Sequence, residues 1–159
     1  MDIYYKQGDV VVRRAYPSDA DMLCNKLRDS DVQEIWASHN LTPWDAIYFG
    51  ITESLLCLTI TVKNVPVGIF GIRPESYIGR TATIWFLASD ELDKIRFRFG
   101  KHSKKFINLL LTLYPYLWNY VDVRNKQSIE WLKFCGAKMN EPEPYGILRK
   151  KFIYFWFER

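Results

Sequence analysis

Runs of β-branched and aromatic residues alternate along this chain with segments whose apolar residues recur every three or four positions. Residues 9–16, "DVVVRRAY", are the first β-rich run, and helical spacing follows from Pro17 onward. A second short helix is predicted at 31–37, and a third from Thr42, which suits an N-cap with Pro43 at the first helical position. The first third of the chain is therefore predicted to be a strand followed by two or three helices.

The pattern changes to strands from residue 55. Two β-rich segments, "LLCLTITV" and "VGIFGIR", flank the turn-like tetrapeptide "KNVP" at 63–66 and predict a hairpin. A third strand is predicted at 81–89, and the longest helical pattern follows at about 91–113, before Pro115.

The last part of the chain predicts a strand at 116–123, a helix at 126–135 closed by Gly136, and an aromatic strand at 151–158. A strand meander followed by a βαβ unit indicates an α+β domain with a mixed, mostly antiparallel sheet and helices on both faces. No linker or internal repeat divides the sequence, so residues 1–159 are expected to form one domain.

Composition narrows the possible classes of protein. Apolar residues make up 48% of the chain, which excludes a disordered protein, and the net charge of +4 suits anionic partners without requiring them. The three cysteines are odd in number and widely separated, and the two histidines give no zinc-ligand spacing, so we expect reduced cysteines and no metal. The N-terminus lacks the pattern of a signal peptide, and no apolar run is long enough to span a bilayer, so a soluble protein is expected.

The stretch "VDVRNKQSIEWLKFCGAK" at 121–138 carries the most specific pattern. A predicted strand ends at Asn125, a helix follows, and Gly136 comes eleven residues after the asparagine. This arrangement resembles the second half of the Gcn5-related N-acetyltransferase (GNAT) fold. The resemblance implies that Asn125 either contacts the pantetheine amides of acetyl-CoA or holds a splayed strand open.

The same resemblance implies a cofactor site upstream. In GNAT proteins the backbone of the fourth strand pairs with pantetheine, which implicates Phe86, Leu87 and Ala88. A basic, glycine-containing turn then directs N–H groups toward the pyrophosphate. The candidate turn spans 96–103, and its candidate contacts are Arg96, Arg98, Gly100, Lys101, His102 and Ser103. The alternative is a solvated basic face at the start of a helix.

Two features depart from the GNAT pattern. Arg96 and Gly100 are one residue too far apart, and His102 or Ser103 stands where a second small residue is usual. Many GNAT proteins carry a tyrosine general acid seven residues after the asparagine, where this chain has Leu132, which has no proton to donate.

A narrower resemblance covers roughly 55–157 and is best from 84 to 138. The segments "RFRFGKHSKKF" and "NYVDVRNKQSIEWL" are similar to the small GNAT-like proteins of T7-like short-tailed phages. Some of those are internal virion or virion-assembly proteins. The resemblance implies a phage protein located in the host cytoplasm or in the virion.

A general base for an amine substrate is sought among acidic residues at strand ends and in loops. The candidates at strand ends are Glu53, Glu75 and Asp90, and a further candidate, His39, lies between two predicted helices. Such residues are more often ordinary surface groups. Of these, Glu53 and His39 are the candidates we retain.

Two hypotheses follow. The first is an acyl-CoA-dependent N-acyltransferase that binds a CoA thioester and an amine acceptor. The second is a non-catalytic GNAT-fold protein that acts in virion assembly or binds a virion or host protein. A nucleic-acid partner is not expected, because the tryptophans give no regular stacking platform.

Overall fold

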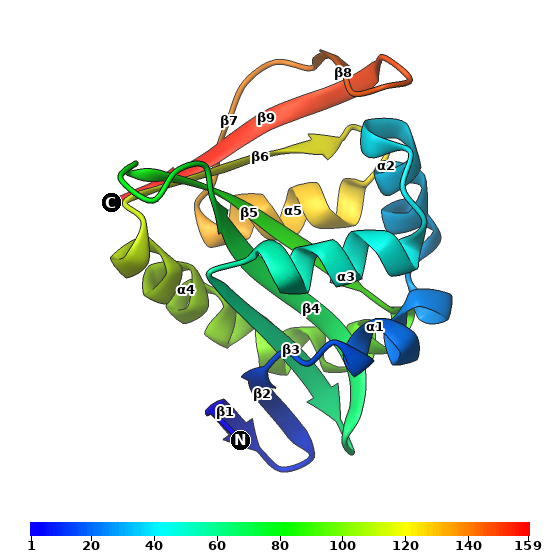
Figure 1. The fold of residues 1–159 in the computed structure, drawn as a ribbon, viewed down its shortest axis with the longest axis vertical. Helices are drawn as coiled ribbons and strands as arrows, with labels where there is room; N and C mark the ends of the chain where they lie inside the picture. The colour runs from blue at the N-terminus through cyan, green and yellow to red at the C-terminus, as the bar shows by residue number, and fades with distance from the viewer.

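The computed structural model describes all 159 residues as one sheet with helices on both faces (Figure 1). The strands are β1 Ile3–Gln7, β2 Val10–Arg14, β3 Leu56–Val62, β4 Val65–Pro74, β5 Thr81–Ala88, β6 Tyr116–Asp122, β7 Lys138–Met139, β8 Glu143–Tyr145 and β9 Lys150–Glu158. The α-helices are α1 Ser18–Leu23, α2 Asp29–His39, α3 Pro43–Glu53, α4 Arg96–Leu113 and α5 Lys126–Cys135. Two 3₁₀ segments, η1 Cys24–Lys26 and η2 Asp90–Ile95, precede α2 and α4.

The sheet has the order β1-β2-β3-β4-β5-β6-β9-β7, and β8 pairs with β9. Every pairing is antiparallel except that of β5 with β6. That parallel pairing covers only Thr81–Thr83 against Tyr116–Trp118, and the two strands then diverge (Figure 1). The divergence leaves a split in the middle of the sheet, at the carboxyl end of β5.

Two hydrophobic cores lie on opposite faces of the sheet because side chains alternate along each strand. Leu56, Leu58 and Ile60 of β3 belong to the core beneath α4 and α5. The intervening Cys57 belongs to the second core, which is formed with α1–α3. The predicted α+β class, with a mixed sheet and helices on both faces, is confirmed.

Local signals account for several element boundaries. The Thr42 hydroxyl accepts the Asp45 N–H at 3.1 Å at the start of α3, as its sequence predicts. The hairpin between β3 and β4 turns on two residues, Lys63 and Asn64, both with positive φ, so the turn is shorter than the predicted tetrapeptide. Strand β1 was not predicted from the sequence, since it is an edge strand whose residues are mostly exposed and show no alternation.

No helix of the structure combines the length and the apolar character needed to cross a membrane.

The turn between β8 and β9 packs tightly on helix α2. Gly146 has φ +74°, and a Cβ there would lie 2.6 Å from Ser38 Cα and 2.8 Å from the Ala37 carbonyl oxygen. We expect Gly146→Ala to lower the free energy of unfolding by about 2–4 kcal/mol, through left-handed strain and overpacking. Gly100→Ala is the matched control, because Gly100 is helical and a Cβ there meets nothing within 4 Å.

Urea denaturation of both variants checks this prediction. Gly100→Ala is expected to raise the free energy of unfolding by about 0.5–1 kcal/mol. A Gly146→Ala protein as stable as wild type would contradict the prediction.

Candidate functional site

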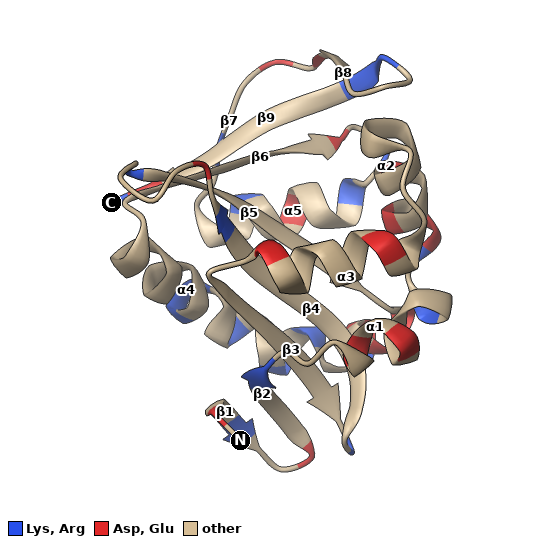
Figure 2. Ribbon diagram, viewed as in Figure 1, with Lys and Arg blue, Asp and Glu red and all other residues tan.

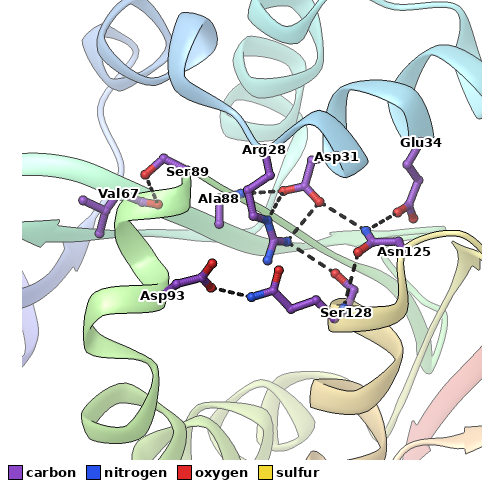
Figure 3. Close-up of polar contacts among 10 residues, drawn as sticks. Arg28, Asp31, Glu34, Val67, Ala88, Ser89, Asp93, Asn125 and Ser128 are labelled. Atoms are coloured by element: carbon purple, nitrogen blue, oxygen red, sulfur yellow. Dashed lines mark hydrogen bonds and ion pairs between the residues drawn. The ribbon is translucent and has the colours of Figure 1, made fainter.

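Residues at the start of helix α2 bond to the carboxyl end of β5, beside the split (Figure 3). The Arg28 N–H donates to the Ala88 carbonyl at 2.9 Å, and the Ala88 N–H donates to Asp31 Oδ2 at 2.9 Å. Leu27 and Ser89 form an isolated antiparallel bridge beside them. Both backbone polar groups of Ala88 therefore bond to the segment that begins helix α2.

Asp31 stands at the centre of a buried polar network. Arg28 and Asp31 are 5% and 2% exposed, and the Arg28 guanidinium donates to both carboxylate oxygens at 3.1 and 3.0 Å. Asn125 Nδ2 donates to Asp31 Oδ1 at 3.2 Å. With the Ala88 N–H, the carboxylate accepts four hydrogen bonds, which is how a buried charge is tolerated.

Asn125 lies where its sequence context predicts, at the mouth of helix α5. Its Oδ1 accepts the Ser128 N–H at 3.3 Å as a helix cap. Its Nδ2 donates to Asp31 and, at 2.7 Å, to Glu34 Oε2. Gly136, with φ +93°, ends the helix. The amide thus joins α5 to α2 across the split, and its contact with a cofactor stays a prediction.

A cavity of about 270 Å³ lies between the diverging strands β5 and β6 and is also lined by residues of α2, α3 and α5. Its wall is largely aromatic and also carries carboxylates; among the lining residues are Asp31, Glu34, His39, Glu53, Trp85, Phe86, Trp118, Asn119, Tyr120 and Trp131. Of the sequence candidates for a base, Glu53 and His39 therefore line the cavity. Glu75, which accepts a hydrogen bond from Thr81, and Asp90, which begins η2, are not among the lining residues.

The two retained candidates differ in their surroundings. Glu53 is half-exposed and forms an ion pair with Arg73 at 2.8 Å. His39 Nδ1 lies 2.8 Å from Ser38 Oγ, and burial and the nearby Arg73 charge lower the pKa of the His39 imidazole. A lowered pKa leaves this imidazole neutral at neutral pH.

Glu34 is one of the titratable residues of the cavity that were not predicted from the sequence. Burial raises the pKa of its carboxyl to about 8; the hydrogen bond from Asn125 lowers it, and the nearby Asp31 and Asp122 charges raise it. The available signal was the i,i+3 spacing of Asp31 and Glu34, which places two carboxylates on one face of helix α2. A carboxyl with such a pKa can exchange a proton near neutral pH.

The turn predicted at 96–103 is wrong. These residues form the first two turns of helix α4, and the Arg96 N–H donates to the Asp93 carbonyl within the preceding 3₁₀ segment. The helical pattern continues without interruption into this stretch, and its single glycine does not break it. Of the N–H groups that a phosphate-binding turn would present, that of Arg96 is therefore engaged within the protein.

Residues of this helix that depart from the GNAT pattern have contacts within the protein. The His102 ring lies against Tyr5 of β1, tilted by 43° with ring centroids 4.4 Å apart. Ser103 is buried and accepts the Trp131 indole N–H at 3.1 Å. Arg96, Arg98 and Lys101 are exposed to solvent.

The edge of β5 that faces the split is mostly bonded to the protein. The Ile84 carbonyl accepts Asn119 Nδ2 at 2.7 Å, and both groups of Ala88 are engaged. By the alternation of a strand, the backbone of Phe86 faces the same side, and its ring stacks on Trp131 at 5.3 Å. Leu87 belongs to the opposite face, against the α1–α3 core.

Sequence comparison identifies the family. The family model described as "Bacteriophage T7, probable scaffold protein Gp13" matches residues 57–142, more than half of the chain. The chain belongs to this Gp13 family. The "Probable scaffold protein gp13" of Escherichia phage T7 is 32% identical over 92 residues, which are 54% of this chain and 59% of that protein. The chain thus spans less than two thirds of the length of this relative.

Structural comparison shows the GNAT fold. A "Probable acetyltransferase" superposes with a TM-score of 0.71 at 13% identity, over 99% of this chain and 97% of the other. A GNAT-family acetyltransferase from Bacillus anthracis gives 0.69 at 13% identity, over 99% and 98%. Spermidine N-acetyltransferase from Vibrio cholerae, in complex with CoA and spermine, gives 0.63 at 12% identity, over 96% of each chain. At such low identity these similarities establish the fold alone.

The carboxyl of Glu34 predicts a pH-dependent stability. Because its pKa is raised to about 8 in the folded protein, the folded state binds more protons than the unfolded state between the two pKa values. Stability from this group is present at low pH and is lost as the pH rises through the folded pKa. Wild type is therefore expected to lose stability from about pH 5 to about pH 8.5 relative to Glu34→Gln.

Urea unfolding of both proteins across this pH range measures the difference. Glu130→Gln is the matched control, since Glu130 is an exposed carboxylate on α5, and it should keep the wild-type slope. Parallel pH profiles for wild type and Glu34→Gln would contradict the assignment.

Proposed function

We propose that this chain is a non-catalytic GNAT-fold protein of phage particle assembly, present in the host cytoplasm or the virion and bound to a virion or host protein. The observation that carries the proposal is the engagement of both Ala88 backbone groups by Arg28 and Asp31. In the GNAT arrangement this strand pairs with pantetheine. Here the last residue of that edge is bonded to the start of helix α2 instead.

Opening that edge has an energetic cost. A ligand that takes the Ala88 N–H leaves the buried Asp31 carboxylate without one of its four donors, which costs about 1–3 kcal/mol or more. That cost lowers the affinity for such a ligand by about fivefold to 10²-fold or more. A GNAT-type cofactor would bind weakly even if all its other contacts were kept.

Charge near the expected pyrophosphate position also disfavours binding of a GNAT-type cofactor. The 3₁₀ segment η2, which connects β5 to α4, carries Asp90, Glu91 and Asp93, of which Glu91 is paired with Lys94. Carboxylates repel a pyrophosphate. The description of the family as a probable scaffold protein also supports an assembly role.

Calorimetric titration with acetyl-CoA tests this proposal. We expect no heat of binding up to about 1 mM ligand, a concentration at which even weak specific binding is detected. The double variant Arg28→Ala/Asp31→Ala removes both charges together and should bind no less acetyl-CoA than wild type. Micromolar binding by wild type that is lost in Arg96→Ala/Lys101→Ala would overturn the proposal.

A second candidate function is an acyl-CoA-dependent N-acyltransferase that modifies an amine. The Glu34 carboxyl favours it, because this group lines a 270 Å³ cavity and burial raises its pKa to about 8. In such a reaction the amine nitrogen attacks the thioester carbon, Glu34 takes the amine proton, and CoA leaves as the thiolate. Leu132 has no proton to give that thiolate. Tyr120, whose side chain carries a hydroxyl, also lines the cavity.

Acetyl transfer from acetyl-CoA to a panel of primary amines, followed by thiol release, distinguishes this candidate. If the chain is a transferase, Glu34→Gln should lower kcat by about 10²-fold or more, since the general base is removed. Glu130→Gln should leave the rate unchanged. Absence of thiol release from wild type with every amine would exclude the transferase for that panel, and an active Glu34→Gln protein would remove Glu34 as the base.

A further inference from the structure

Helix α4 carries positive charge and no carboxylate within its own length (Figure 2). Its eighteen residues include five cations and no acidic residue: Arg96, Arg98, Lys101, Lys104 and Lys105. All five are exposed, and none takes part in an ion pair of the structure.

Exposed aromatic rings accompany these cations. Phe97 is 78% exposed and Phe134 of the neighbouring α5 is 54% exposed. The Arg96 guanidinium lies 4.7 Å from the Phe97 ring centroid, and the Lys104 ammonium lies 4.8 Å from that of Phe134. We call these five cations and two rings the basic face.

The other side of the sheet has the opposite character (Figure 2). Residues 18–53, which contain α1–α3, hold seven carboxylates against only two cations, Lys26 and Arg28. Two of the carboxylates are buried in ion pairs, and the exposed or partly exposed remainder includes Asp21, Asp29 and Asp45.

Aromatic rings are exposed on this side as well. Trp36, Trp44 and Phe49 are 55%, 38% and 44% exposed, and the Trp44 indole N–H donates to Asp21 at 2.8 Å. We call Asp21, Asp29, Asp45 and these three rings the acidic face. Each face thus combines charge of one sign with exposed aromatic rings, a residue type that is enriched at protein interfaces.

We propose that the basic face of one copy of this chain binds the acidic face of another. The two faces lie on opposite sides of the sheet, so the contact joins unlike surfaces and leaves a free face at each end. Such a heterologous contact repeats into a ring or an open chain of copies. This inference rests on the proposed assembly function and gives it a partner, a second copy of the protein.

Complementarity between the faces is the reason to choose a second copy as the occupant. A nucleic acid would use the basic face alone and would leave the acidic, aromatic face without a partner. A second copy uses both faces at once, with opposite charges and exposed rings on each. Because the charges are exposed, salt should weaken the contact.

Charge exchange between the faces tests the proposal. Arg98→Glu/Lys101→Glu/Lys105→Glu reverses the basic face, and Asp21→Lys/Asp29→Lys/Asp45→Lys reverses the acidic face. Sedimentation velocity at about 0.05 M and about 0.5 M salt measures self-association of each variant. We expect association by wild type at low salt, and at least about tenfold weaker association at high salt or in either triple variant.

The decisive protein carries all six changes. Its net charge stays at +4, and its two faces are again complementary, so self-association should return. A mixture of the two triple variants should also associate, because each offers the face that the other lacks. Arg149→Glu/Lys150→Glu/Lys151→Glu is the matched control, with the same change in charge on exposed residues elsewhere, and should associate like wild type.

Three outcomes would overturn the inference. The first is a wild type that is monomeric at every concentration and salt. The second is a six-change protein that stays monomeric although circular dichroism shows it folded. The third is a basic face that binds an oligonucleotide while no self-association occurs. If the acidic triple variant fails to fold, the basic triple variant and its control still decide the role of α4. None of these results depends on acetyl-CoA, so failure here is separable from failure of the calorimetric test.

Discussion

The Asp31 carboxylate connects three parts of the chain that are distant in sequence. It accepts hydrogen bonds from Arg28 at the start of α2, from the Ala88 N–H of β5, and from Asn125 at the start of α5. A charge this deeply buried is tolerated only while all these donors are in place. The relative positions of α2, β5 and α5, and therefore the width of the split, depend on this one group.

The network shows how the split edge of the GNAT fold is bonded from within this protein. A sheet that diverges between β5 and β6 leaves backbone groups without strand partners, and a buried group must find another partner. In this chain Arg28, Asp31 and Asn119 bond to that edge from within the protein. Two residues that depart from the GNAT pattern also have contacts within the protein: the His102 ring lies against Tyr5, and Leu132 belongs to the hydrophobic core.

The cavity beside the network is the part of the structure most relevant to a catalytic role. Its aromatic wall and the raised pKa of Glu34 are compatible with a bound amine, yet the same raised pKa follows simply from burying a carboxyl beside Asp31. Fold similarity does not choose between these meanings, because activity belongs to a site and not to a topology. The segregation of charge between the basic and acidic faces is a separate feature, because it requires neither the cavity nor a cofactor.

The sequence determined the features that local physics controls. Alternation and helical spacing predicted most strands and helices, Thr42 and Pro43 predicted the start of α3, and Gly136 predicted the end of α5. Tertiary structure alone decided the site. The contact of Asn125 with Asp31 spans 94 residues and that of Ala88 with Asp31 spans 57, and no periodicity encodes such pairings. The helical pattern at about 91–113 agrees with η2 and α4, whereas the turn at 96–103, taken from the GNAT resemblance, does not, because these residues are helical.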